Sequence, residues 1–371
     1  MIELEQVTKI FDDGTTAVDD VSFTVEQGEL CVLLGPSGCG KTTTMKMINR
    51  LVPLTRGKIL IDGKDILHFA DTELRMQIGY AIQEIGLFPH LTVAENIEVV
   101  PELRGWSKAK RRERAAKLLE MVKLTPKEFM DRYPKELSGG QRQRVGVARA
   151  LGADPEYLLM DEPFGAIDPI TRVDLQNEFL KIQQDIKKTI VFVTHDIYEA
   201  IKMGDKIALM NGGKLIQFDA PFNILFNPQN EFVSGFVGRD RALKGLQLIR
   251  AKAVMRKAVF MAQATETVEE LKRRVGPEHE KDEIPVAKED GTFVGFVNLQ
   301  EADSGQVSEH LQHVRAVASM DTVLDEALSV MLSGERNILA MLDHDNRLQG
   351  VLTFSDIQRA LSEADKSRGT L

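Results

Sequence analysis

The chain lacks a long apolar run, since no stretch approaches the roughly 18 residues that a membrane-crossing helix needs. Its first residues also lack the basic and apolar regions of a signal peptide. Both absences predict a cytosolic polypeptide that takes part in a membrane process only through a partner. Cysteine is scarce as well, and in such a reducing compartment we expect no disulfide between Cys31 and Cys39.

Positive charge is in deficit, with 47 Lys and Arg against 56 Asp and Glu and a formal net charge of −9. Proteins that bind nucleic acid usually present a basic face, so this balance argues against that class. Hydrophobic residues make up 43% of the chain and charged residues 28%, which is typical of a soluble globular protein. A length of 371 residues allows two or three domains, each with its own core.

A glycine-rich loop follows an apolar, strand-like run over 30–34 and precedes a helical segment over 44–49. Its spacing fits G-x-x-x-x-G-K-[ST], in which backbone N–H groups turn toward phosphate oxygens. Lys41 would reach the terminal phosphates, and the Thr42 hydroxyl would ligate Mg²⁺. A plain strand-to-helix turn is the alternative, but it leaves the Lys-Thr pair unexplained. The loop residues are Gly35, Pro36, Ser37, Gly38, Cys39, Gly40, Lys41, Thr42 and Thr43.

Several apolar strands further along the chain end in polar side chains. These polar residues are Gln83, Asp161 with Glu162, and His195. Strand ends that deliver polar groups to one sheet edge are typical of an α/β active site. Asp161 would hold Mg²⁺, Glu162 would polarise a water molecule, and Gln83 would join the ion and the water. Taken singly, each residue also has a structural interpretation as a strand-end hydrogen bonder or part of a solvated turn.

A second helix N-terminus follows a helical block over 91–136. It begins with Ser138, Gly139, Gly140 and Gln141, whose exposed amides would bind an anion. A single nucleotide does not account for two phosphate-binding sites in one compact domain. The second site would therefore bind a nucleotide that is held by another copy of the chain. Further on, we expect a turn over 164–169 and a helix over 175–186.

The last third of the chain contains an internal repeat. Thr267 and Thr322, Asp290 and Asp345, Gly295 and Gly350, and Glu301 and Asp356 recur at one offset of 55 positions. Each copy is predicted to fold as an extended segment, a helix, a strand, a turn, a strand and a helix. Repeats of this kind bury their sheets against each other.

Residues 1 to about 240 resemble the ATPase subunits of ATP-binding-cassette (ABC) transporters, with every family motif in order. The resemblance implies an α/β P-loop cassette with a RecA-like core, an antiparallel β subdomain and a helical subdomain. It implies that two subunits sandwich two ATP molecules, each held between one chain's loop at 35–43 and the other's Ser138-Gly139-Gly140. Ile167 stands where leucine is usual, which is a conservative departure.

The resemblance also implies a role for each motif residue. Phe11 would stack on the adenine, 35–43 would be the Walker A loop, Gln83 the Q-loop glutamine, and Leu137 to Gln141 the signature motif. Asp161 and Glu162 would be the Walker B metal ligand and general base, Asp168 the D-loop aspartate, and His195 the switch histidine that contacts the γ-phosphate.

Three segments, 38–50, 85–90 and 164–172, are similar to the ATPases of glycine betaine, carnitine and choline importers. This implies a homodimer at the cytoplasmic face of the inner membrane, bound to permease subunits near residues 84–105. A separate substrate-binding protein would act indirectly and, with the permease, would choose the solute. An ABC ATPase for another small solute stays an alternative. So does one acting on DNA or ribosomes, although such chains usually carry two cassettes or long coiled-coil insertions.

The repeat resembles a tandem pair of cystathionine-β-synthase (CBS) modules, which often bind adenosyl nucleotides. Thr353 and Asp356 are similar to the family's ribose-contacting pattern, whereas the first copy has Asn298-Leu299-Gln300-Glu301 instead. The ligand implied is an adenine nucleotide or cyclic dinucleotide; a dimerisation module without ligand is the alternative. We expect a nucleotide-binding domain over 1–240, linker and first module over 241–303, and second module with a tail over 304–371.

Overall fold

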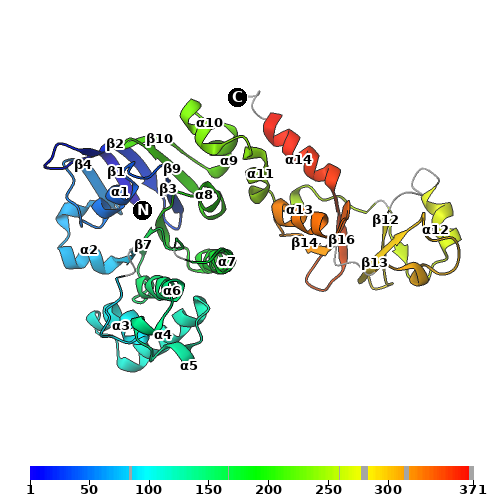
Figure 1. Cartoon of the computed structure of the whole chain (residues 1–371), viewed down its shortest axis with the longest axis horizontal. Helices are drawn as coiled ribbons and strands as arrows, with labels where there is room; N and C mark the ends of the chain where they lie inside the picture. The colour runs from blue at the N-terminus through cyan, green and yellow to red at the C-terminus, as the bar shows by residue number, and fades with distance from the viewer. Residues whose placement is uncertain (83–85, 166, 259, 277–282, 313–316, 367–371) are drawn as a thin grey trace. The chain divides into compact units, whose positions relative to one another are not determined.

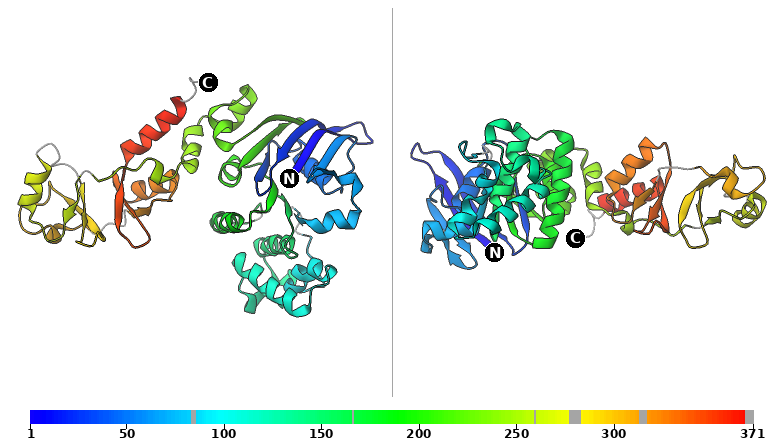
Figure 2. Two further views of the ribbon diagram at one scale, coloured as in Figure 1. Left: turned by 180° about the vertical axis from the view of Figure 1, so that it is seen from behind. Right: turned by 90° about the horizontal axis from the view of Figure 1, so that it is seen from below.

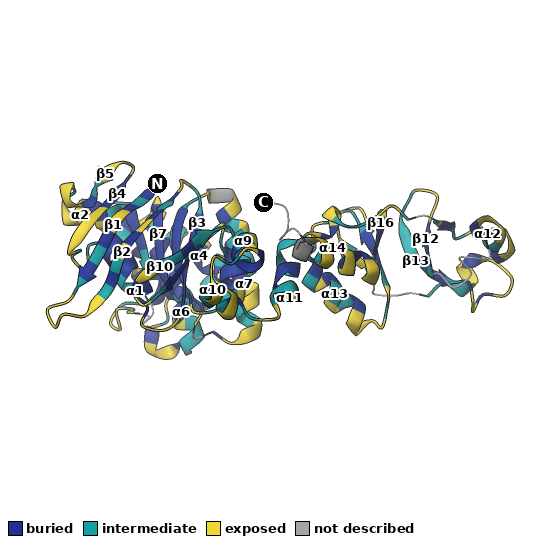
Figure 3. Cartoon of the chain, turned by 90° about the horizontal axis from the view of Figure 1, so that it is seen from above, coloured by how far each residue is buried: buried dark blue, intermediate teal, exposed yellow. Residues whose placement is uncertain are grey.

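The computed structural model describes all residues except 83–85, 166, 259, 277–282, 313–316 and 367–371 (Figure 1). The described part divides into two compact units. The first unit contains residues 1–224 and 228–236, and the second contains 225–227 and 237–371. Figure 2 shows the chain from two further sides, and Figure 3 shows that each unit has its own buried interior.

A six-stranded sheet forms the centre of the first unit, in the order β10-β9-β3-β8-β7-β6. Neighbours from β9 to β6 are parallel, whereas β10 pairs with β9 antiparallel. Strands β3, β7 and β8 are buried at every residue, which explains their apolar sequences. Because parallel strands end at one edge, the loops after β3, β7 and β8 meet there. The strands are β3 (Leu30–Leu34), β6 (Ile78–Ala81), β7 (Tyr157–Asp161), β8 (Thr189–Val193), β9 (Lys206–Asn211) and β10 (Lys214–Asp219).

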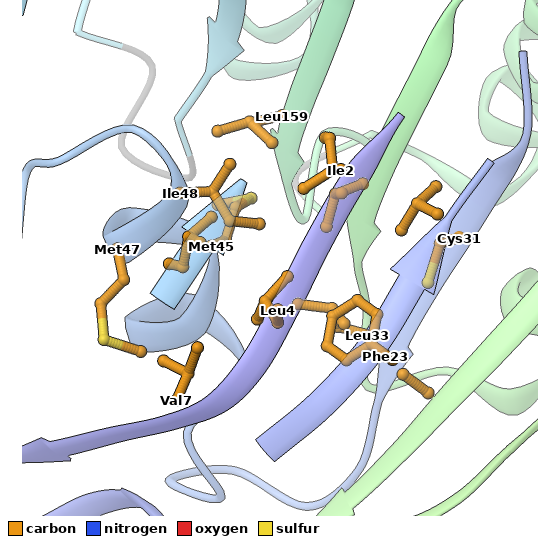
Figure 4. Close-up of a cluster of buried hydrophobic side chains, with 14 of the residues drawn as sticks. Ile2, Leu4, Val7, Phe23, Cys31, Leu33, Met45, Met47, Ile48 and Leu159 are labelled. Atoms are coloured by element: carbon orange, nitrogen blue, oxygen red, sulfur yellow. The ribbon is translucent and has the colours of Figure 1, made fainter. Parts of the chain in front are cut away.

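A second, antiparallel sheet has the order β2-β1-β4-β5. Its strands are β1 (Ile2–Ile10), β2 (Thr16–Val25), β4 (Arg56–Ile61) and β5 (Lys64–Asp65). Side chains from this sheet, from the central sheet and from helix α1 (Lys41–Ile48) form one buried cluster (Figure 4). Ile2 and Leu4 of β1 belong to it together with Met45 and Ile48 of α1. The cluster therefore holds α1, and the loop before it, against both sheets.

Residues 93–150 are mainly helical, in agreement with the predicted block over 91–136 and the predicted helix after Ser138. The helices are α3 (Val93–Leu103), α4 (Lys108–Met121), α5 (Pro126–Phe129) and α6 (Gly139–Ala150), with a 3₁₀ turn over Pro134–Glu136. Helix α3 begins with a capping box in which Thr92 and Glu95 satisfy each other's backbone N–H groups. Ala115, Leu118 and Leu119 make the buried face of α4, in agreement with their helical spacing.

The other α-helices in the described part of residues 1–240 are α2 (Asp71–Gln77), α7 (Pro169–Ile186), α8 (Ile197–Met203), α9 (Pro221–Phe226) and α10 (Glu231–Val237). Helix α7 begins six residues before the predicted start at 175. The Asp168 carboxylate accepts the Thr171 N–H over 3.0 Å, and Pro169 occupies the first helical position. This cap and the proline start the helix at a point that apolar spacing did not indicate.

The second unit contains two three-stranded sheets, β11-β12-β13 and β14-β15-β16, each with one parallel and one antiparallel pairing. Gly295 pairs with Val286, and Gly350 pairs with Met341, so equivalent positions of the two copies share one register. The predicted repeat is therefore a structural repeat. The elements are α11 (Arg241–Gly245), β11 (Ala262–Gln263), α12 (Val268–Val275), β12 (Glu283–Ala287), β13 (Phe293–Asn298), β14 (Val317–Ser319), α13 (Leu324–Ser333), β15 (Ile338–Leu342), β16 (Leu348–Thr353) and α14 (Phe354–Lys366).

The hairpin tips join the two copies. The Phe293 N–H donates to the Asn346 carbonyl over 3.0 Å, and the Leu348 N–H donates to the Gly291 carbonyl over 3.1 Å. Phe296 of the first copy lies in the hydrophobic cluster of the second copy. Within the described residues of both units, no helix is long and apolar enough to cross a membrane.

Candidate active site

The glycine-rich loop lies between β3 and α1, as its sequence predicted. Gly35 and Gly40 have φ angles of +146° and +101°, a region that side-chain-bearing residues rarely adopt. A Cβ atom on Gly35 would lie 2.2 Å from the Met210 carbonyl oxygen, and one on Gly40 would lie 2.3 Å from that of Ala17. Both positions therefore require glycine for backbone conformation and for space.

Lys41 is the first residue of α1 and is 6% exposed. Its ammonium group donates to the Gly35 and Pro36 carbonyl oxygens over 2.7 and 2.8 Å. The loop backbone thus holds the ammonium group within the loop. The first turn of α1 itself contains no acidic residue, so the helix adds no negative charge of its own at its positive end. The loop, the lysine and the helix end together offer positive charge to a polyphosphate.

Thr42 and Asp161 bring together a hydroxyl and a carboxylate beside this loop. The Thr42 hydroxyl donates to the Asp161 carboxylate over 3.0 Å, although the two residues come from α1 and from the end of β7. Burial raises the pKa of Asp161 above its usual value, and the hydrogen bond from Thr42 opposes that rise. Oxygen ligands of this kind suit Mg²⁺, which usually takes few protein ligands and completes its shell with phosphate and water. The described residues contain no group of three His, Cys, Asp or Glu that would hold a metal alone.

Glu162 and His195 contact each other at the same sheet edge. Nδ1 of His195 lies 3.0 Å from the Glu162 carboxylate, with the histidine side chain 63% exposed and the glutamate 21% exposed. Glu162 has φ +46°, which costs a non-glycine residue conformational energy. Its N–H donates to the Val193 carbonyl, and its own carbonyl accepts from Gly165 N–H and from the Gln143 amide. These contacts hold a strained backbone that turns the carboxylate toward the histidine.

Comparison with known proteins agrees with this geometry. A family model described as ABC transporter matches residues 18–165, and one described as CBS domain matches residues 312–363. The osmoprotectant import ATP-binding protein OsmV of Salmonella typhimurium is 44% identical over 374 residues, covering 99% of this chain and 98% of that protein. The glycine betaine/carnitine/choline transport ATP-binding protein OpuCA of Bacillus subtilis is 42% identical over 364 residues, covering 96% of this chain and 95% of that protein.

The chain belongs to the family of ABC transporter ATP-binding proteins. The solved dimeric structure of MJ0796, a bacterial ABC transporter cassette, matches it with a TM-score of 0.56 and 35% identity, over 60% of this chain and 99% of that one. The first unit is therefore an ABC cassette that binds ATP, and the second unit ends in a CBS domain. The predicted fold class is confirmed.

The N-terminus of α6 carries the predicted signature motif. The Ser138 hydroxyl accepts the Gln141 N–H over 3.2 Å, and the Gln141 side chain accepts the Ser138 N–H over 2.9 Å. Gln141 thus completes a capping box, and the side chain of Ser138 is exposed. A Cβ on Gly139 would meet nothing within 4 Å, so there is open space beside this turn. The helix end can accept an anion from another molecule.

Three other predicted site residues of the cassette lie as follows. Phe11 follows β1, is 40% exposed, and has the Lys9 ammonium 5.0 Å from its ring centre. An exposed ring of this kind is available for stacking. Asp168 caps α7, and that hydrogen bond lowers the pKa of its carboxyl. Gln83 lies outside the described residues.

In the second unit, Thr353 ends β16 and Asp356 lies in the first turn of α14. Thr353 lines a cleft of about 600 Å³ between the two copies. Asp356 is 2% exposed and forms ion pairs with Arg256 and Arg359 at 3.3 and 2.6 Å. Its carboxylate also accepts the Thr353 N–H over 3.0 Å. The cleft is lined by Arg256, Phe260, Glu283, Asn298, Thr353 and Ser355, among others.

The sequence did not indicate several buried polar residues near the active site. Gln143 of α6 donates to the Glu162 carbonyl, and Gln176, Thr194 and Glu199 form a separate hydrogen-bonded group. All four are at most 8% exposed. One signal was present: Gln143, Gln176 and Glu199 occupy helix positions that face the interior, and Thr194 directly follows the buried strand β8.

Proposed function

We propose that this protein is the ATP-hydrolysing subunit of an importer for a quaternary-ammonium osmoprotectant such as glycine betaine, carnitine or choline. The observation that carries the proposal is the assembly of Lys41, Thr42, Asp161, Glu162 and His195 at one edge of the cassette sheet. The relatives named for osmoprotectant import and for glycine betaine, carnitine and choline transport support the choice of solute, since they match nearly the whole chain. An ABC ATPase for another small solute, or one without a transporter, is the alternative.

In this proposal the chain's own residues perform four tasks. Lys41 and the loop amides bind the phosphates, and Thr42 with Asp161 would hold Mg²⁺, which neutralises charge on the phosphates when bound. Phe11 would stack on the adenine. Glu162 acts as general base toward a water molecule, and His195, which contacts Glu162, would also touch the terminal phosphate. Gln83 would orient the water and the ion.

The signature turn would act on a partner's nucleotide. Ser138, Gly139 and Gly140 present an open helix N-terminus, and the matched MJ0796 cassette is dimeric. We propose a homodimer that closes on two ATP molecules, each between the loop of one protomer and the signature turn of the other. Asp168 would lie at that interface. Preorganised amides at the γ-phosphate would then supply much of the transition-state stabilisation.

A permease would dock beside residues 84–105, which places the protein peripherally at the cytoplasmic face of the membrane. A groove of about 290 Å³ supports the choice of this region as the docking site, since Phe88, Val99 and Val100 line the groove. Asn49 is 5% exposed in the same groove, and its side-chain oxygen has no hydrogen-bond partner among the described residues. An incoming permease segment would supply that donor. A substrate-binding protein would take part only through the permease.

The second unit would regulate transport by binding an adenine nucleotide or cyclic dinucleotide in its cleft. The cleft combines Phe260 for stacking with Arg256 and Thr353 for polar contacts. The Asp356 carboxylate is already paired with Arg256 and Arg359, so ribose hydroxyls would have to compete with these arginines. Calorimetry of the full chain with adenine nucleotides, comparing wild type with Thr353→Val, tests the assignment. Equal binding heat in both would exclude Thr353 from the site.

Two variants test the ATPase assignment. Glu162→Gln should bind ATP normally yet lose hydrolysis by roughly two orders of magnitude, the scale of removing a general base. Lys41→Ala should instead weaken ATP binding by roughly ten- to a hundredfold, because it removes charge-assisted contacts to phosphate. Lys117→Ala, an exposed lysine on α4, is the control. Normal turnover in Glu162→Gln would remove that residue from its role.

Transport itself is tested by reconstituting the protein with its permease and measuring uptake of labelled betaine, carnitine and choline. ATP-dependent uptake of at least one of them is expected, and it should disappear with Glu162→Gln. Hydrolysis without association with any permease would favour the alternative without a transporter. The division into a nucleotide-binding domain over 1–240 and modules over 241–303 and 304–371 is part of the proposal.

A further inference from the structure

A buried carboxylate joins the histidine loop of the cassette to helix α7. Glu199 of α8 is 8% exposed, and its two oxygens accept hydrogen bonds from two different elements. The Thr194 hydroxyl donates over 2.6 Å, and the Gln176 amide of α7 donates over 3.0 Å. Thr194 and Gln176 are 2% and 4% exposed, so the whole group is removed from solvent.

The two hydrogen bonds match an ionised Glu199. The Thr194 hydroxyl and the Gln176 amide both donate here, and an ionised carboxylate accepts at both oxygens. Burial raises the pKa of Glu199 above its usual value, whereas these two hydrogen bonds and nearby Arg172 oppose that rise. Water does not compete for these hydrogen bonds inside the fold, so each is stronger than an equivalent bond at the surface.

The two elements that Glu199 joins both lead to the active site. Thr194 immediately precedes His195, and its oxygen also accepts the Asp196 N–H over 3.0 Å, which fixes the loop on both sides of the histidine. Helix α7 begins at Pro169, directly after its cap Asp168, and its Arg172 donates to the Ile167 carbonyl over 3.0 Å. A displacement of α7 would therefore be transmitted through Gln176 and Glu199 to the backbone that carries His195.

We propose that Glu199 is a positioning residue for hydrolysis. It fixes the His195 loop relative to α7, so that the histidine contacts Glu162 and the terminal phosphate only when α7 is correctly placed. The inference rests on the proposed function, since it gives the histidine a task in hydrolysis. It assigns Glu199 no contact with the nucleotide. The expected effect is therefore on turnover and not on ATP binding.

The test uses the full chain and compares kcat with KM for ATP. Glu199→Gln keeps the volume but replaces one acceptor oxygen by a donor, so kcat should fall roughly tenfold, the effect of losing one charge-assisted hydrogen bond. KM should stay within about twofold, because Lys41 and Thr42 do not belong to the group. Glu120→Gln, an exposed glutamate on α4, is the matched control. A rise in KM that equals the loss of kcat would overturn the proposal.

Thr194 provides a pair of variants that separates positioning from folding. Thr194→Ser keeps the hydroxyl and should retain most of the activity, whereas Thr194→Val keeps the shape and should lose as much kcat as Glu199→Gln. Thermal unfolding of each variant identifies any loss that comes from instability, and the comparison is made below every melting midpoint. Equal activity of the serine and valine variants would contradict the proposal.

A double variant decides whether Glu199 acts through the histidine. If it does, His195→Ala combined with Glu199→Gln should be no slower than His195→Ala alone. Losses that multiply would show that Glu199 acts elsewhere and would overturn the proposal. A different result would refute the proposed function. If the wild-type protein did not hydrolyse ATP, the proposed function would be wrong. If the wild-type protein were active and Glu199→Gln were equally active, only this inference would be wrong.

Discussion

The side-chain amide of Gln143 donates a hydrogen bond of 2.9 Å to the main-chain carbonyl of Glu162. Gln143 belongs to the helix that begins with the proposed signature turn, and Glu162 is the proposed general base. The bond therefore connects the segment that would face a partner's nucleotide to the backbone that carries the base. Glu162 has a positive φ angle, so its carboxylate direction depends on such external contacts.

Replacing Gln143 by leucine should lower kcat roughly tenfold, since it removes a buried hydrogen bond from a strained peptide. ATP binding should be unchanged, because the phosphate loop is not involved. The measurement is steady-state hydrolysis together with an ATP titration. Gln184→Leu, at an exposed glutamine of α7, serves as the control. Unchanged turnover in Gln143→Leu would show that the peptide keeps its conformation without the amide.

Ser138 caps α6 and is also proposed to contact a partner's nucleotide, and comparison with a second variant can separate these two roles. Ser138→Ala removes the N-cap of α6 and should lower the free energy of unfolding by about 1 kcal/mol. Thr92→Ala removes the equivalent cap of α3 and should cost a similar amount. We expect only Ser138→Ala to weaken ATP-driven dimerisation, measured by size-exclusion chromatography in the Glu162→Gln background. Equal dimerisation of both variants would place the signature turn away from the partner's nucleotide.

Gly40 is constrained by space as well as by conformation. Gly14 has a similar φ of +83°, but a Cβ there would meet nothing within 4 Å. Gly14→Ala should therefore cost about 1 kcal/mol, the strain of a left-handed conformation alone. Gly40→Ala should cost roughly 3 kcal/mol or more and weaken ATP binding, because its Cβ would collide with the Ala17 carbonyl. Denaturant unfolding measures the loss of stability in each variant, and ATP titration measures the loss of binding. An equal loss of stability in Gly14→Ala and Gly40→Ala would contradict the steric argument.

Glu95 makes the stability of the cassette depend on pH. The backbone N–H and hydroxyl of Thr92 lower the pKa of Glu95 below its usual value. Its ionised form therefore contributes stability above the unfolded-state pKa, and this contribution is lost as the pH falls through the folded-state pKa. The difference in unfolding free energy between wild type and Glu95→Gln should shrink on acidification. In a Thr92→Ala background the difference should be smaller at neutral pH; an unchanged difference would refute the capping explanation.

Local spacing was sufficient to predict the phosphate loop and the polar strand ends, whereas the subdomains of the cassette were implied by the family resemblance. The glycines and Lys41 lie at fixed offsets in one loop. Asp161 ends one apolar strand and His195 lies two residues beyond another, and parallel strands bring their carboxyl ends to one edge of the sheet. The repeat was recognisable because each copy keeps its glycine in the same register. Helix α7 was predicted to begin too late, since apolar periodicity does not report a start that Asp168 caps. The predicted role of Gln83 falls outside the described residues.

The sequence by itself determined which side chains are available and at which strand and helix ends they occur, because these depend on residues close together in the chain. Tertiary structure decided which of them meet. Gln143 contacts the Glu162 peptide, Glu199 joins Thr194 to Gln176, and Asp356 pairs with Arg256 only after helices and strands have packed. A buried polar group must find its partners among the groups that packing brings near, and no spacing along the chain specifies those partners.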